Sequence, residues 1–253
     1  MAKVKSASDI ELLRESGRRL SRVLKSVAAA VRPGISTKEL ELIAERLILE
    51  GGDELPFKNY TPYGAGYPYP SCICVSVNDE VVHGIPSERV LREGDIVGID
   101  LGLSHYGLIT DSAVSVAVGE VKPEVAKLLE KTREALWTGI RAAKGGARIG
   151  DIGAAIEAVA KKEGYGIVRE LGGHGVGHAV HEEPYVPNYG KKGTGPILKP
   201  GMVLALEPMF NLGKDDVRLM PDGYTVVTED GSLSAHFEHT ILITDRDAEV
   251  LTA

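Results

Sequence analysis

A ten-residue segment of this chain occurs twice, and this repeat constrains the fold more than any other feature. The first copy, Leu91–Asp100, reads LREGDIVGID, and the second, Leu198–Glu207, reads LKPGMVLALE, 107 residues further along. In each copy a glycine precedes an apolar run that ends in a carboxylate, which is typical of a strand with an acid at its end. A chance match over one strand is the alternative. Two copies of one unit would bring their sheets together and direct both acids into a shared cleft.

Two amphipathic helices are predicted at the start of the first copy. Ser8, with Glu11 three residues later, is a capping-box pattern, and apolar residues then recur every three or four positions as far as Pro33-Gly34. A second helix is expected after the Ser-Thr pair at 36–37, and it should end at Gly51-Gly52. The first copy therefore opens with two helices.

The second copy follows the same order of elements. Pro123 opens a third helix that breaks at Gly145-Gly146, and a fourth helix is expected over Ile149 to Glu163. We therefore expect an α/β (α+β) fold with two α-α-β repeats, about 8–120 and 121–251, within a single domain of 1–253. The predicted strands of the first repeat are Cys72–Val77, Asp95–Leu101 and Ala113–Val118.

Composition excludes several classes of protein. The formal net charge is −7, from 36 acidic residues against 29 lysines and arginines, so no direct nucleic-acid binding is expected. The only cysteines, Cys72 and Cys74, are too close along an extended segment to form a disulfide with each other. The sequence contains no secretory signal pattern, and no apolar run approaches the ~18 residues of a membrane span. We expect a cytoplasmic protein with no membrane partner.

Four carboxylates border apolar runs: Asp100 and Asp111 in the first repeat, Glu207 and Glu238 in the second. The spacing of the two aspartates fits a hairpin, in which antiparallel pairing would put them side by side. A single acid at a strand end usually points to water. Four acids in one cleft would instead repel one another and lose hydration, so they need a counter-charge. Two divalent cations would supply it.

His174 is the candidate nitrogen ligand, within the glycine-rich segment Gly172–Gly177. Glycines let the backbone come close to a neighbour or a ligand, although a hydrogen-bonded loop histidine is the alternative. A dinucleotide fingerprint is discarded because no GxGxxG follows a strand and opens a helix. One imidazole and four carboxylates suffice for two ions when some carboxylates bridge, and oxygen-rich ligation suits Mn, Fe(II) or Co better than a structural Zn site of Cys and His.

These residues and their surroundings resemble the type I methionine aminopeptidases over nearly the whole chain. The resemblance rests on the five residues above and on three motifs: VHGIP at 82–86, EEPYVPNY at 182–189 and SLSAHFEHT at 232–240. It implies the pseudo-twofold pita-bread fold, in which two α-α-β repeats surround a curved antiparallel sheet. It also implies a metal-dependent hydrolase that removes the initiator methionine from nascent proteins and peptides with a small second residue.

The resemblance implies a role for each metal-binding candidate. Asp100 and Asp111 would bind one ion and His174 the other, with Asp111 and Glu238 bridging the pair. Glu207 would bind the second ion and act as general base toward a water molecule. The two ions would be drawn from Co, Mn, Fe(II) or Zn.

Two histidines and an apolar pocket complete the implied site. His83 and His181 would contact the substrate amide and stabilise the developing oxyanion, although His83 alone could equally be structural. Four positions depart from the usual residues of the family, which has Phe at 180, often Trp at 224, Cys at 82 and Gln at 236. The implied pocket for the methionine side chain consists of Tyr69, Cys74, Val180 and Tyr224.

Two alternative functions share this pattern. Xaa-Pro aminopeptidases and prolidases have the same five ligands but generally carry an extra domain before the first long helix, which here begins at about Ser8. A non-catalytic pita-bread binding module would have a degraded ligand set. The expected partners are peptide and nascent-chain N-termini. Ribosome docking is implied by the resemblance, without support from a cluster of positive charge, and we expect a monomer.

Overall fold

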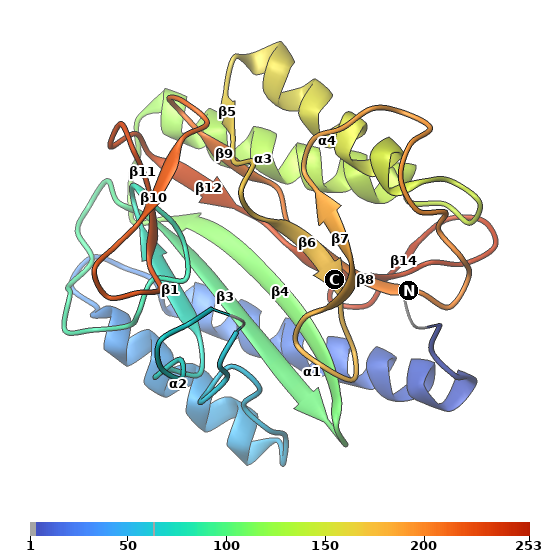
Figure 1. Ribbon diagram of the computed structural model, residues 1–253. Helices are drawn as coiled ribbons and strands as arrows, with labels where there is room; N and C mark the ends of the chain where they lie inside the picture. The colour runs from blue at the N-terminus through green and yellow to red at the C-terminus, as the bar shows by residue number, and fades with distance from the viewer. Residues whose placement is uncertain (1–3, 63) are drawn as a thin grey trace.

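The computed structural model describes residues 4–62 and 64–253. Two helices belong to each half of the chain: α1 (Ala7–Ala30) and α2 (Thr37–Glu50), then α3 (Pro123–Ala142) and α4 (Ile149–Glu163). The two pairs lie at opposite sides of the molecule, and strands from both halves meet between them (Figure 1). In the described residues, no helix has the length and apolar character that crossing a bilayer requires. The strands are β1 (Cys74–Val77), β2 (Glu80–Val82), β3 (Ile96–His105), β4 (Leu108–Ala117), β5 (Gly166–Ile167), β6 (Gly172–Gly175), β7 (Glu182–Pro187), β8 (Val203–Leu206), β9 (Met209–Asn211), β10 (Val217–Leu219), β11 (Val226–Thr228), β12 (Ser234–His236), β13 (His239–Leu242) and β14 (Glu249–Val250).

Helix ends follow the expected local signals, with one correction. The N-cap of α1 is Ser6, whose side chain accepts from the backbone of Asp9 while the Asp9 carboxylate accepts from Ser6 N–H. The predicted Ser8–Glu11 capping box is therefore wrong, because the reciprocal bonds form two residues earlier. The bounds of α4 are as predicted, and Gly164 ends that helix in the left-handed conformation at φ 76°.

The β3–β4 hairpin is longer than predicted. Its two-residue turn is Tyr106-Gly107, with φ values of 49° and 78°, as a type I′ turn requires. The strand runs through Gly102, where an added Cβ would lie 2.8 Å from the ring of Phe57. The predicted segments 95–101 and 113–118 thus cover only part of β3 and β4, and the predicted strand at 72–77 begins two residues later, at Cys74.

This longer hairpin moves the two aspartates away from strand ends. Asp100 pairs with Ala113 and Asp111 pairs with Gly102, so the acids are diagonal neighbours in the middle of the hairpin rather than directly opposite. The prediction of a terminal acid is wrong for Asp100, but Glu207 does follow the end of β8 directly.

The two halves join where β2 pairs with β11 and along a seam between β4 and β13. β1-β3-β4 and β14-β13-β8-β6-β7 are separate antiparallel sheets, and the backbone N–H of Glu238 donates to the Ala113 carbonyl at 2.9 Å across the gap. Thr240 adds to the seam, because its hydroxyl accepts from Asp111 N–H at 2.9 Å and donates to the Asp111 carbonyl at 2.7 Å. The seam therefore holds two of the predicted ligands, Asp111 and Glu238.

Each helix pair has its own apolar core against its own strands. Leu20 of α1 and Leu40 of α2 pack with Ile99 of β3, whereas α3 and α4 pack around Leu204 of β8 and Phe210 of β9. Burial of these side chains accounts for most of the stabilisation of each half. The seam between the halves lies beside a cavity.

Candidate active site

A cavity of about 480 Å³ opens beside the seam. Every residue predicted for metal binding, catalysis or the methionine pocket borders it: His83, His181, Asp100, Asp111, His174, Glu207, Glu238, Tyr69, Cys74, Val180 and Tyr224. The fold therefore brings predicted site residues into one cavity although they lie up to 169 positions apart in the chain, from Tyr69 to Glu238.

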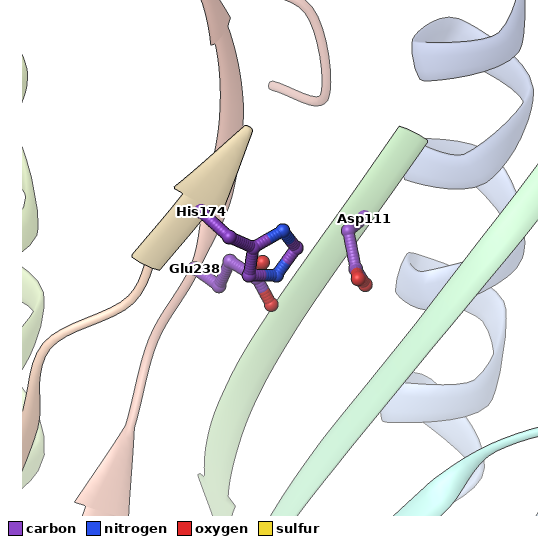
Figure 2. Close-up of side chains that lie close together, drawn as sticks. All are labelled: Asp111, His174 and Glu238. Atoms are coloured by element: carbon purple, nitrogen blue, oxygen red, sulfur yellow. The ribbon is translucent and has the colours of Figure 1, made fainter. Parts of the chain in front are cut away.

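Three of the predicted ligands converge most closely. Asp111 on β4, His174 on β6 and Glu238, which directly precedes β13, each offer a ligand atom within 4.8 Å of the others (Figure 2). All three side chains are buried. Asp100 and Glu207 border the same cavity but stand outside this closest group.

The buried carboxylates lack the partners that would stabilise their charge. Oδ1 of Asp100, Oδ1 of Asp111 and Oε1 of Glu238 are buried without a hydrogen-bond partner among the described residues. Burial raises the pKa of Asp111 to about 7, and burial together with the Asp111 charge raises the pKa of Glu207 to about 8. Such oxygens need a cation nearby, so this donor set fits divalent metal ions.

The ring of His174 is prepared to act as a neutral nitrogen ligand. Its Nδ1 donates to the carbonyl of Gly175 at 2.9 Å, which leaves Nε2 facing Oε1 of Glu207 at 3.6 Å. Burial lowers the pKa of His174 to about 3, so the ring is uncharged near neutral pH. In a metal-binding histidine, the tautomer is usually fixed by a hydrogen bond that the ring nitrogen not bound to the metal donates to a nearby acceptor.

The glycines around His174 permit close approach of backbone segments. An added Cβ at Gly173 would lie 2.2 Å from the Ala205 carbonyl oxygen, and one at Gly175 would lie 2.4 Å from that of Glu183. At Gly177 it would meet the side chain of Lys5 at 2.6 Å. These positions therefore require glycine, as the segment's composition suggested.

His181 and His83 stand beside the buried acids. The ring of His181 meets that of His174 edge-on at 4.4 Å, and its Nδ1 is hydrogen-bonded to the hydroxyl of Tyr60 at 2.8 Å. His83 has a left-handed backbone, φ 61°, which is unusual for a side chain with a Cβ and is found at strained functional positions. Burial lowers its pKa to about 4, so it is neutral near pH 7.

An apolar slot forms part of the cavity lining. Tyr69, Cys74, Val180 and Tyr224 form one buried cluster together with Phe57. The Tyr69 and Tyr224 rings pack edge to face at 5.0 Å. Such a lining of aromatic rings and a thiol suits a flexible, polarisable thioether side chain.

A comparison with known protein families matches residues 11–245 of this chain to the metallopeptidase family M24. The chain belongs to the M24 metallopeptidase family. The buried carboxylates and imidazole described above are the donor types that a metallopeptidase needs.

Proteins named methionine aminopeptidases are similar to this chain over nearly their full length. Methionine aminopeptidase 1 of Bacillus subtilis (strain 168) is 46% identical over 248 residues, which cover 98% of each chain. A crystal structure of a methionine aminopeptidase from Thermotoga maritima has a TM-score of 0.95 and 41% identity, covering 100% of this chain and 99% of that one. The expected pita-bread fold is therefore confirmed.

More distant solved structures share the fold alone. The prolidase from Pyrococcus furiosus has a TM-score of 0.77 and 22% identity, and the match covers 99% of this chain but 65% of the prolidase. This chain is more similar, and over a larger share of their length, to proteins named methionine aminopeptidases than to the prolidase. The comparison therefore favours the methionine aminopeptidases over the prolidase alternative.

Sequence reasoning missed part of the cavity wall. Tyr60 and Pro62 lie in an irregular segment before β1, where no periodic pattern marks a buried face, and Tyr185 alternates with buried residues of β7. His236 was noted only as a departure from the family, but its Nε2 lies 3.8 Å from Oε2 of Glu207. The other lining residues not predicted are Phe57, Val82, Leu171, Gly172, Glu182 and Glu183.

Proposed function

We propose that this chain is an aminopeptidase that removes the N-terminal methionine from peptides and nascent proteins whose second residue is small. The proposal rests on one cavity, in which buried acids without hydrogen-bond partners lie next to an apolar slot that suits a methionine side chain. The full-length similarity to proteins named methionine aminopeptidases supports the same activity.

The proposed cofactor is a pair of divalent metal ions, drawn from Co, Mn, Fe(II) or Zn. Asp100 and Asp111 would hold one ion, His174 and Glu207 the other, and Asp111 and Glu238 would bridge them. Support comes from the orphaned oxygens of three of these acids and from Nε2 of His174, which faces Glu207 while Nδ1 is bonded to Gly175. When bound, the ions supply a lowered pKa for a water molecule and polarisation of the scissile carbonyl.

The protein's own groups carry the proton transfers and orient the peptide. Glu207 accepts a proton from the attacking water, since its carboxylate borders the cavity between His174 and His236. His83 and His181 lie on the cavity wall, from which a ring N–H of each donates to the substrate amide and to the oxyanion as charge develops there. The apolar slot binds the side chain of the first residue of the peptide substrate.

The proposal includes the setting of the reaction. The site draws its residues from both halves, which supports a single catalytic domain over 1–253. We propose cytoplasmic action, as a monomer, on peptide and nascent-chain N-termini. Contact with the ribosome has little support, because the adjacent basic residues are short pairs such as Arg18-Arg19, Lys161-Lys162 and Lys191-Lys192.

Removal and restoration of metal test the function. The protein is stripped with a chelator, reloaded with Mn, Fe(II), Co or Zn in turn, and assayed on Met-Ala-Ser and on Ala-Pro. We expect cleavage of Met-Ala-Ser only after reloading. Cleavage by the stripped protein would refute the metal requirement, cleavage of Ala-Pro alone would assign the chain to the prolidase branch, and cleavage of neither peptide would favour a binding module.

A further inference from the structure

The first described residues of the chain, Val4 and Lys5, are attached to the second half of the protein. Lys5 N–H donates to the Gly201 carbonyl at 2.8 Å, and Val4 forms a β-bridge with Met202. These contacts attach residues 4–5 to the turn before β8, the strand that leads to Glu207. The backbone of the segment is thereby fixed beside the second half of the protein.

The ammonium of Lys5 is fully buried and paired with one carboxylate. Its Nζ donates to Oε2 of Glu182 at 2.6 Å and to Nδ1 of His178 at 3.3 Å. The Lys5 side chain has no exposed surface, and that of Glu182 is 10% exposed. The alkyl stem packs directly against Gly177, where a Cβ would collide with it. A buried pair with this many bonds has one geometry available to it.

The partner carboxylate closes the loop between β6 and β7. Oε1 of Glu182 accepts the backbone N–H of His178 at 2.7 Å and of Ala179 at 3.2 Å. The next two residues are Val180, in the wall of the apolar slot, and His181, beside His174. Both oxygens of Glu182 are thus used, one by the loop and one by Lys5.

A second contact extends the connection to α1. Nε2 of His178 lies 3.5 Å from Oδ2 of Asp9, which also takes part in the N-terminal cap of α1. The His178 ring is therefore placed between Lys5 and Asp9. The loop is held on its outer side by residues that precede or begin the first helix.

We propose that Lys5 is a positioning residue for the active site, because its buried pairing with Glu182 fixes the 176–181 loop and, through it, Val180 and His181. Lys5 does not border the cavity, so its effect is indirect. The kinetic consequence rests on the proposed aminopeptidase function, whereas the order of the loop does not.

The test compares Lys5→Met with a matched control, Lys127→Met. Lys127 also pairs with one glutamate, Glu163 at 2.8 Å, but on the surface of α3 and α4 and away from the cavity. The double variant Lys5→Met/Glu182→Gln buries no unpaired charge and keeps an oxygen for the two loop N–H groups, so it is expected to fold even if Lys5→Met does not.

Three quantities are measured on each metal-loaded protein: kcat and KM for Met-Ala-Ser and Leu-Ala-Ser, bound metal, and hydrogen exchange of segment 176–182. In both Lys5 variants we expect kcat for Met-Ala-Ser to fall about 10- to 100-fold, and the preference for Met over Leu to fall roughly 10-fold. Exchange at His178 and Ala179 should accelerate. Metal content and all values for Lys127→Met should match the wild type.

The outcomes distinguish a failure of the inferred role of Lys5 from a failure of the proposed function. Wild-type selectivity together with wild-type exchange in both Lys5 variants would overturn the inference, as would equal changes in Lys127→Met. If the wild-type protein cleaves neither peptide, the proposed function fails, but the exchange measurement still decides whether Lys5 fixes the loop.

Discussion

Nε2 of His236 lies 3.8 Å from Oε2 of Glu207, and this nitrogen is buried without a hydrogen-bond partner in the described part of the chain. The backbone of His236 is fixed on both sides, since its N–H donates to Ser115 Oγ at 2.9 Å and its carbonyl accepts from that hydroxyl at 2.8 Å. Burial lowers the pKa of His236 to about 3, so the ring is neutral near pH 7. A neutral imidazole with its proton on Nε2 is a donor that faces this carboxylate, and we expect it to donate to Glu207 in the active enzyme.

Loss of this donor is expected to disturb Glu207. His236→Leu should lower kcat about 10- to 100-fold, as is typical when a group that orients a metal ligand is removed. His236→Gln should retain most of the activity, because an amide N–H can make the same bond. Steady-state kinetics on Met-Ala-Ser with equal metal loading checks this, and equal rates for the Leu variant and the wild type would contradict it.

Replacement of the proposed base should affect the chemical step. Glu207→Gln is expected to reduce kcat by roughly 10²- to 10⁴-fold, while the circular dichroism spectrum and cooperative unfolding stay unchanged. The amide has nearly the same shape as the carboxylate but does not take up the proton. A near-native rate would remove Glu207 as the base.

Metal loading should stabilise a site that strains the metal-free fold. At a metal concentration about 100-fold above Kd, binding adds about 2.7 kcal/mol to the free energy of unfolding, or roughly 5–10 °C in melting temperature for a chain of this size. Above pH 8, where Asp111 and Glu207 lose their protons in the fold, Asp111→Asn should raise the melting temperature of the metal-free protein, because it removes one of the mutually repelling charges, and it should weaken the response to metal. Thermal scans with and without Mn measure both effects. A metal-free Asp111→Asn protein that melts below the metal-free wild type would count against repulsion as the source of strain.

The metal-free protein should lose stability as the pH rises above 7. The carboxyls of Asp111 and Glu207 keep their protons to about pH 7 and 8 in the fold, whereas in the unfolded chain they titrate near pH 4. The folded state therefore binds more protons, and its free energy of unfolding decreases with increasing pH until both acids are ionised.

Buried histidines do not mask this trend. Burial lowers the pKa of His83 and His174 to about 4 and 3, so their contribution changes only below about pH 6.5, where the unfolded chain protonates. Urea unfolding of chelator-treated protein at pH 7, 8 and 9 tests the prediction. A rise in stability over that range would show that the acids ionise freely in the fold.

Local signals predicted the helices well because each signal is complete in the sequence. Pro123 and Gly164 fix the start of α3 and the end of α4 through backbone geometry alone. The strand bounds were predicted less accurately, because a glycine such as Gly102 resembles a turn residue in the sequence. Only the structure shows that the ring of Phe57 packs against it. That contact is tertiary and leaves no mark on the local pattern.

The candidate site was recoverable where acids interrupt apolar runs. Asp111 and Glu238 are predicted from that pattern, and the structure brings them together across the seam. Tyr60 and Lys5 were not predicted, because each acts through a partner more than 100 positions away, His181 and Glu182 respectively. Nothing in the neighbouring residues distinguishes them from ordinary loop or surface side chains.

The seam between β4 and β13 also sets the order in which activity arises during synthesis. The half that is translated first contains Asp100 and Asp111 but lacks His174, Glu207 and Glu238, so it holds less than half of the proposed ligands. Glu238 enters only when β13 pairs with its neighbours, after the other four proposed ligands have been made. An enzyme proposed to act on proteins still being made is therefore itself inactive until its own chain has been produced and folded as far as β13.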